Sequence, residues 1–135
     1  MDGNPTSRVS NANGLAVLLL VRDLESAVLF HREVLGARVE GAGEGEALVH
    51  GAHGTWRLRA DRLETVRVLR DIVALVVRRG AGIELRVQVE DPAACEARAR
   101  ELGFGVLMPA RDVGGSLEAL LVDGDGYVWV AHAPA

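Results

Sequence analysis

The residues best suited to contact a ligand lie in one short segment, Ile83 to Val89, where apolar and polar side chains alternate strictly. Because successive side chains of a strand point to opposite faces, Glu84, Arg86 and Gln88 share one face of the predicted strand. Charged groups on a half-enclosed apolar surface need partners or a ligand. Two interpretations stay open: these residues anchor a ligand in a pocket, or their face simply meets water.

Apolar, aromatic and histidine side chains complete the predicted ligand-binding set. Val130 and His132 share one face of the last predicted strand, and Trp56 offers a flat surface for stacking, although an ordinary core position suits Trp56 equally well. No catalytic residue is predicted. The predicted ligand-binding residues are Leu18, Trp56, Leu58, Glu84, Arg86, Gln88, Val130 and His132.

The elements that carry these residues occur twice along the chain. Val21-Arg-Asp23 and Val89-Glu-Asp91 each end on an Asp that can cap a helix N-terminus, and the two Asp residues are 68 positions apart. Leu35-Gly36 and Leu102-Gly103 each end on a Gly that can close a helix, 67 positions apart. Matched start and stop signals in the same register predict an internal repeat.

Each predicted helix follows one strand and precedes three, so the sequence predicts an α+β fold of two βαβββ repeats. The strands are expected at 15–21, 37–40, 47–50 and 55–59, and at 83–89, 104–108, 116–122 and 127–132. The predicted organisation is a disordered lead at 1–14, repeats at 15–60 and 82–135, and a connector with a short helical piece at 61–81. Pairing the two curved sheets would form a cup around an apolar cavity, with the helices outside.

Composition limits the classes of function. With 135 residues, 49% hydrophobic and 25% charged, the chain is typical of one globular domain. Its net charge of -4 argues against a nucleic-acid or membrane partner. A cytoplasmic location is expected, because the N-terminus has no apolar signal segment. Cys95 is the single cysteine, which excludes an intrachain disulfide, and its place on the apolar side of a helix predicts a buried thiol.

Three segments resemble the glyoxalase/bleomycin-resistance/extradiol dioxygenase (vicinal oxygen chelate) superfamily, and they span nearly the whole chain in the right order. Residues 21–36 are similar to its V-x-D…A-x-x-F-Y-x-x-x-L-G opening, with His31 in the usual place of Tyr. Residues 82–92 resemble the central strand that leads into the second helix, and residues 123–129 resemble the closing D-P-x-G-N-x-W turn.

The resemblance implies four metal ligands, and the sequence departs from that pattern. The first-strand and last-strand ligand positions correspond to Ala16 and Val130, which have no donor atom, and the fourth-strand position falls at 57–59, which is Arg-Leu-Arg. Only Glu84, at the fifth-strand position, is a plausible ligand, and one carboxylate does not fix a divalent ion against water. We therefore expect no metal and no cofactor.

The expected function is that of a metal-independent small-molecule-binding protein, similar to the bleomycin-resistance branch and suited to sequester an antibiotic or a hydrophobic metabolite. A homodimer is expected, either side by side or strand-swapped. The alternative is a vicinal oxygen chelate enzyme, such as a glyoxalase-type lyase, an isomerase or a dioxygenase, and a metal-free version would use Glu84 as base or His132 as proton shuttle. An accessory dimer without a ligand is a third possibility.

Overall fold

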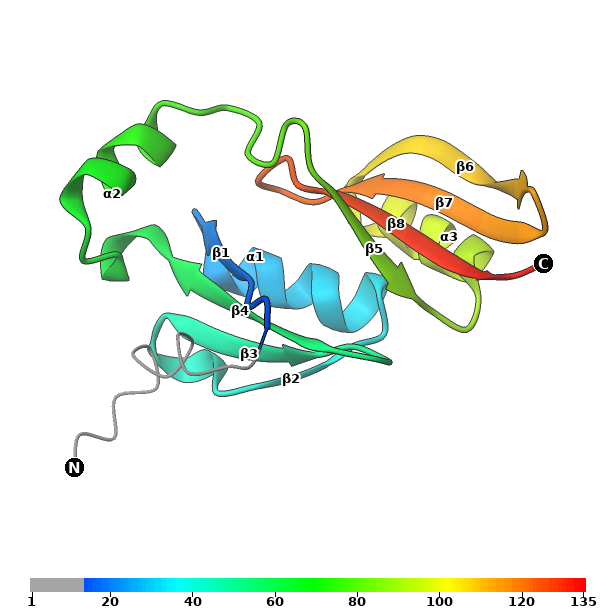
Figure 1. Ribbon diagram of the computed structural model, residues 1–135, viewed down its shortest axis with the longest axis horizontal. Helices are drawn as coiled ribbons and strands as arrows, with labels where there is room; N and C mark the ends of the chain where they lie inside the picture. The colour runs from blue at the N-terminus through cyan, green and yellow to red at the C-terminus, as the bar shows by residue number, and fades with distance from the viewer. Residues whose placement is uncertain (1–13) are drawn as a thin grey trace.

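The computed structural model describes residues 14–135, so nearly all of the predicted N-terminal lead lies outside the described residues. Two four-stranded mixed sheets form the body of the protein (Figure 1). The first has the strand order β1-β4-β3-β2 and the second the order β5-β8-β7-β6. Within each sheet the first pair (β1 with β4, β5 with β8) is parallel and the other pairs are antiparallel. The predicted α+β fold of two βαβββ repeats is confirmed.

The strands of the first sheet are β1 (Leu18–Val21), β2 (Arg38–Glu40), β3 (Glu46–His50) and β4 (Thr55–Ala60). Those of the second are β5 (Glu84–Gln88), β6 (Gly105–Val113), β7 (Ser116–Val122) and β8 (Val128–Pro134). The helices are α1 (Leu24–Leu29), continued by a π-helical turn (Phe30–Val34), α2 (Arg67–Ala74) and α3 (Pro92–Leu102), with single 3-10 turns at Ala42–Glu44 and Asp61–Leu63.

The predicted helix boundaries are set by the expected local signals. The Asp23 carboxylate accepts a 3.0 Å hydrogen bond from the amide of Glu25, and the Asp91 carboxylate accepts one of 3.1 Å from the amide of Ala94. Gly103 ends α3 with a φ of 83°, a left-handed conformation that favours glycine. Capping at both helix starts thus fixes the position of each helix relative to the strand before it.

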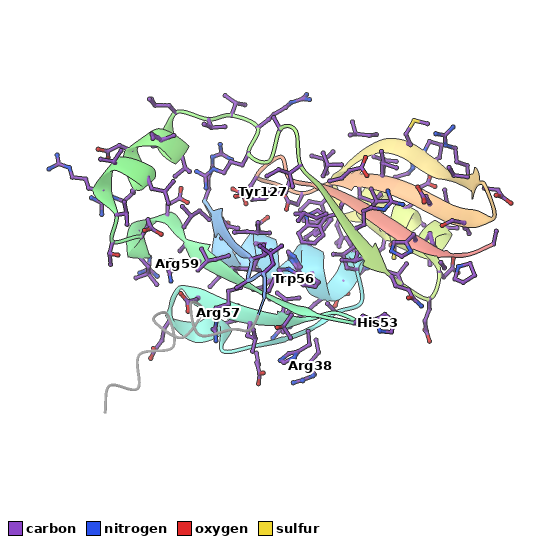
Figure 2. The ribbon with its side chains drawn as sticks, viewed as in Figure 1. Arg38, His53, Trp56, Arg57, Arg59 and Tyr127 are labelled. Atoms are coloured by element: carbon purple, nitrogen blue, oxygen red, sulfur yellow. The ribbon has the colours of Figure 1, made fainter. Side chains whose placement is uncertain are left out.

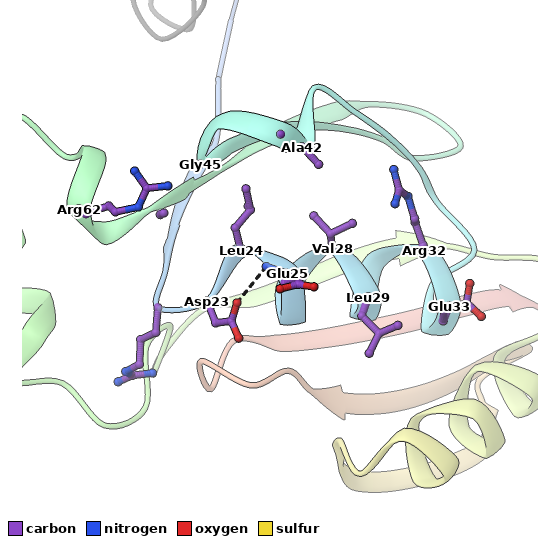
Figure 3. A pocket seen from close by; sticks show the side chains of 13 residues that line it. Asp23, Leu24, Glu25, Val28, Leu29, Arg32, Glu33, Ala42, Gly45 and Arg62 are labelled. Carbon is purple, nitrogen blue, oxygen red and sulfur yellow. Dashed lines mark hydrogen bonds between the residues drawn. The ribbon is translucent and has the colours of Figure 1, made fainter.

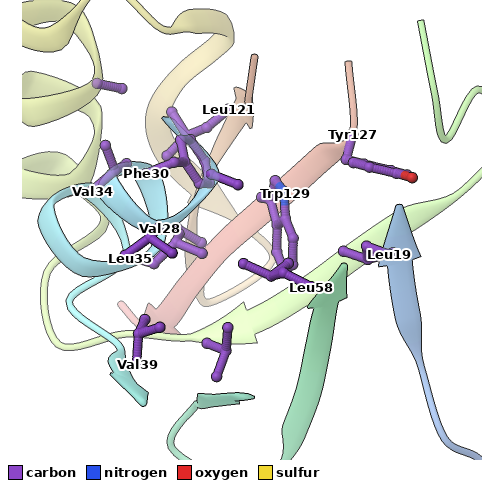
Figure 4. Packing of buried hydrophobic residues seen from close by; sticks show 14 of the residues in the cluster. Leu19, Val28, Phe30, Val34, Leu35, Val39, Leu58, Leu121, Tyr127 and Trp129 are labelled. Atoms are coloured by element: carbon purple, nitrogen blue, oxygen red, sulfur yellow. The ribbon is translucent and has the colours of Figure 1, made fainter. Parts of the chain in front are cut away.

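Both sheets pack their apolar faces against α1 and α3, so the two repeats share one core. Figure 4 shows Phe30 from the π-helical turn beside Trp129 from β8, with Leu58 from β4 nearby. All three side chains are at most 1% exposed. Cys95 is also buried in this core, as predicted, and burial raises the pKa of its thiol to about 11.

The two sheets stay open and unclosed within the described chain. Both sheets turn an apolar face toward the helices. The Glu84 and Arg86 side chains on the open face of the second sheet are 53% and 46% exposed. The two sheets also remain separate and share no strand pairing.

Strand β6 continues to Val113, five residues beyond the predicted end at Met108. The strand runs through Pro109, although proline cannot donate to a strand ladder. β6 is an edge strand, where proline is tolerated, and its pairing with β7 shifts register between Val106 and Met108 and again between Met108 and Arg111.

The segment between the repeats forms an arm that carries α2 away from both sheets (Figure 1). Arg79, only 3% exposed, anchors its end by donating to both carboxylate oxygens of Asp61, at 2.6 and 2.7 Å, and to the carbonyl of Leu20 at 3.1 Å. The large apolar side chains exposed on the arm are Val66, Val68, Leu69, Ile72, Leu75, Val76 and Val77. No helix within residues 14–135 is long and apolar enough to cross a membrane.

Candidate functional site

An aromatic cluster forms where the start of β4 meets β8. The rings of Trp56 and Trp129 lie 5.5 Å apart at an interplanar angle of 36°, and the His31 ring meets Trp129 edge-on at 4.9 Å and 88°. Phe30 extends the cluster, with its centroid 6.2 Å from that of Trp129. The two repeats therefore meet through aromatic rings, and one of these, Trp56, also reaches the surface.

Trp56 forms one wall of a pocket of about 250 Å³ between the β3–β4 turn and β5. Leu85 and Val87 of β5 supply apolar lining, and Arg86 and Gln88 supply polar groups. Trp56 lies on β4 and His53 in the turn that precedes it (Figure 2). The residues that line the pocket are Val17, Gly51, Ala52, His53, Gly54, Thr55, Trp56, Leu85, Arg86, Val87, Gln88 and Trp129.

Two neighbours hold the Trp56 ring. Its indole Nε1–H donates a 3.1 Å hydrogen bond to Nε2 of His31. On the turn side the ring lies against Gly51, where an added Cβ would come within 2.8 Å of the Trp56 Cζ3 atom. Burial lowers the pKa of His31 to about 4, against the opposing effect of its hydrogen bond to the Ala27 carbonyl, so the imidazole is neutral at physiological pH.

A charged group lies beside the pocket on the open face of the second sheet. Arg86 donates to a Glu84 oxygen at 2.9 Å and to a Glu118 oxygen at 2.5 Å. These bonds, that of Glu84 first, raise the pKa of the Arg86 guanidinium above its ordinary value. Because Arg86 stands between two carboxylates, its charge is already balanced before any ligand arrives.

The structure brings together three of the eight predicted ligand-binding residues. Trp56, Arg86 and Gln88 line one pocket, and Glu84 contacts it indirectly through Arg86. The alternation predicted for β5 is confirmed, because Leu85 and Val87 pack on the core while the polar residues are exposed.

The other four predicted residues lie outside the pocket. The Leu58 side chain is 0% exposed and packs in the core. Val130 and His132 pair with Arg86 and Gln88 on the open face of the second sheet. Leu18 pairs with Arg57 in the first sheet. None of these last three lines the pocket.

Several residues of the pocket were missed by the sequence analysis. Val17, Gly51, His53 and Trp129 line it from three different parts of the chain. His31 carried a usable signal, since a histidine on the buried face of a helix needs a hydrogen-bond partner. The segment 51–54 falls between the strands predicted at 47–50 and 55–59, and nothing in its sequence indicated a ligand contact.

Two further hollows lie on the surface. One, of about 720 Å³, runs between α1 and the 3-10 turn after β2, where Leu24, Val28, Arg32 and Ala42 line it (Figure 3). The other, of about 1290 Å³, adjoins the Trp56 pocket and shares residues with it. The first has no aromatic lining and none of the predicted ligand-binding residues, so the Trp56 pocket with its adjoining groove is the better candidate.

The residues at the implied metal-ligand positions do not fit a divalent metal. Ala16 has no donor, Val130 is buried and apolar, and the β4 position is occupied by Arg57 and Arg59. Glu84 is exposed and bonded to Arg86. Within residues 14–135, no three His, Cys, Asp or Glu side chains come together in a group that could hold a metal ion.

Comparison with known proteins identifies the fold. No protein-family model matches the chain, and no curated protein matches its sequence. Among solved structures, a glyoxalase/bleomycin resistance protein/dioxygenase family enzyme from Burkholderia phytofirmans superposes with a TM-score of 0.70 at 13% identity, over 89% of this chain and 97% of that one. The fosfomycin resistance protein FosX from Mesorhizobium loti gives 0.63 at 19%, over 92% and 94%.

TioX from Micromonospora sp. ML1 gives a TM-score of 0.64 at 21% identity, over 91% of this chain and 97% of that one. These alignments cover nearly the full length of each protein, and both βαβββ repeats fall within them. The chain therefore has the fold of the glyoxalase/bleomycin resistance/dioxygenase proteins, the superfamily that its sequence motifs resemble.

Proposed function

We propose that this protein binds a small organic molecule without a metal, and that a flat ring of the ligand packs against Trp56. The observation that carries the proposal is the pocket between the β3–β4 turn and β5, where an aromatic wall and two apolar side chains adjoin Arg86 and Gln88. Largely apolar pockets with a few fixed polar groups are typical ligand sites in proteins.

The size of the pocket indicates how such a ligand would lie. A volume of about 250 Å³ is just below the roughly 300–1,000 Å³ of common ligand sites, so it holds one or two rings. The larger groove shares Gly51, Ala52, Trp56, Val87 and Gln88 with the pocket. A ligand with a ring in the pocket and a longer body along the groove suits an antibiotic or a hydrophobic metabolite.

Catalysis is less well supported than binding. The metal-dependent reactions of this superfamily require a ligand set that the chain lacks. A metal-free base at Glu84 would need an apolar enclosure to favour its protonation, whereas this carboxylate is 53% exposed and bonded to Arg86.

A titration tests the proposal. The neutral fluorophore N-phenyl-1-naphthylamine and a panel of aromatic antibiotics are added to protein dialysed against EDTA, and quenching of tryptophan fluorescence is followed. We expect saturable binding to the wild type, weakened at least tenfold by Trp56→Ala and unchanged by Leu107→Ala, an exposed residue of β6. Absence of saturable binding by every compound would contradict the proposal.

We also propose that a second copy of the chain covers the apolar arm. Seven large apolar side chains from Val66 to Val77 are exposed, which is too many for an isolated surface segment. The charges around them are mostly basic, with Arg67, Arg70 and Arg78 against Asp71, whereas the chain as a whole carries -4. The arm is thus complementary in charge to the rest of another copy.

Light scattering after size-exclusion chromatography tests the dimer. We expect the wild type to elute as a dimer and Leu69→Glu to shift it to monomer, because a charge on the apolar face opposes burial. Leu107→Glu, at an exposed position of β6 outside the arm, is the matched control for an added carboxylate. A wild-type monomer at high micromolar concentration would contradict the dimer.

A further inference from the structure

His31 is buried at the centre of the aromatic cluster and has no part in the function proposed above. Its side chain is 1% exposed, in the π-helical turn that follows α1. Both ring nitrogens have a partner: Nδ1 lies 2.8 Å from the Ala27 carbonyl oxygen, and Nε2 lies 3.1 Å from the Trp56 indole nitrogen. Neither ring nitrogen is left without a hydrogen-bond partner.

The chemistry of these two partners fixes the tautomer. A carbonyl oxygen only accepts hydrogen bonds, so Nδ1 must carry the proton that reaches Ala27. An indole N–H only donates, so Nε2 must present its lone pair to Trp56. His31 is therefore a neutral Nδ1–H imidazole that offers Trp56 one directed acceptor.

The histidine is held as firmly as the indole that it contacts. Its ring packs in a T-shaped arrangement with Trp129 at 4.9 Å and 88°, and with Phe30 at 5.6 Å and 76°. Gly51 closes the opposite side of Trp56, and its missing Cβ leaves room for the indole. The indole is thus held by a directed hydrogen bond on one side and a close backbone contact on the other.

We propose that His31 is a positioning residue, whose acceptor nitrogen sets the orientation of Trp56 as the wall of the ligand pocket. This inference rests on the proposed binding function. A wall held in one orientation presents a flat surface before the ligand arrives, so less conformational entropy is lost on binding. Without the acceptor, the indole N–H loses its partner and the ring turns toward water, which narrows the pocket.

A spectroscopic experiment tests the hydrogen bond without any ligand. The chain has only two tryptophans, so the two indole N–H signals in a ¹⁵N-labelled sample are assigned with Trp56→Phe. We expect the Trp56 signal to exchange slowly with solvent in the wild type. It should shift and exchange at least tenfold faster in His31→Phe, which keeps a ring but no acceptor, and recover in part in His31→Gln.

The matched control is His50→Phe, because His50 lies on β3 with its side chain toward Glu40, and the Trp56 signal should not move. The wild type alone also tests the tautomer through the ¹⁵N shifts of the His31 ring. A protonated Nε2 in the wild type would overturn the inference, and this measurement needs no variant. An unchanged Trp56 signal in folded His31→Phe would overturn it as well.

Binding of N-phenyl-1-naphthylamine then tests positioning. We expect His31→Phe to weaken binding about tenfold, which is the size of one lost hydrogen bond, and His31→Gln to restore most of it. Unchanged binding in His31→Phe, with a displaced indole signal, would refute positioning and leave the proposed function standing. A wild type that binds nothing, with the indole signal as expected, would refute the proposed function and with it the positioning role, while the hydrogen bond and the tautomer would stand.

Discussion

Buried His31 predicts a specific dependence of stability on pH. Its pKa is about 4 in the folded protein and 6.5 as the ordinary value, so between these values the unfolded chain binds more protons than the folded one. Stability is therefore complete above pH 6.5 and falls as the pH is lowered toward 4. The expected loss from this group is about 2 kcal/mol at pH 5 and about 3 kcal/mol at pH 4.

Urea unfolding followed by circular dichroism, from pH 4 to pH 8, measures this loss. His31→Phe removes the titrating group, so the difference in unfolding free energy between wild type and variant should change by about 3 kcal/mol across the range. His31→Gln is the control, and its curve should run parallel to that of His31→Phe. Curves of wild type and His31→Phe that fall in parallel would refute the assignment of a neutral, buried imidazole.

Three further predictions concern other parts of the structure. Gly51→Ala should lower the free energy of unfolding by about 1–3 kcal/mol and weaken N-phenyl-1-naphthylamine binding, since the new Cβ meets the Trp56 ring. Gly43→Ala is the control, because its Cβ meets no neighbouring atom, and it should change neither quantity. Equal effects of the two substitutions would contradict the contact between Gly51 and Trp56. Arg79→Ala should lower the free energy of unfolding, measured in urea, by about 3–5 kcal/mol, because Asp61 loses its bidentate partner. A decrease below about 1 kcal/mol would contradict the role of Arg79 as anchor of the arm. Metal analysis of purified protein by mass spectrometry should find less than stoichiometric Ni, Zn, Fe and Mn, and one bound equivalent would restore the metalloenzyme hypothesis.

Much of the fold could be predicted because its signals are local. Asp23 and Asp91 cap helices through bonds to amides two or three residues away, and Gly103 closes a helix by its own backbone conformation. The strict alternation around Arg86 also told which face of β5 turns from the core. Such signals need no knowledge of distant parts of the chain.

The site was only partly predictable because two sheets must approach each other to make it. Trp56 and Leu58 share the helix-facing side of β4, and alternation alone cannot tell that one reaches a pocket while the other is fully buried. The difference arises at the start of β4, where Trp56 lies at the rim of the core and contacts Gly51 and Trp129. That contact joins residues of different repeats and has no local sequence signal.

The most direct test of the whole account is a crystal structure of the protein with a bound aromatic compound selected by the titration. The account predicts a ring packed against the Trp56 indole between the β3–β4 turn and β5, within reach of Arg86 and Gln88, with no metal ion in contact with it. A ligand held elsewhere, or one coordinated to a metal ion beside Glu84, would contradict it.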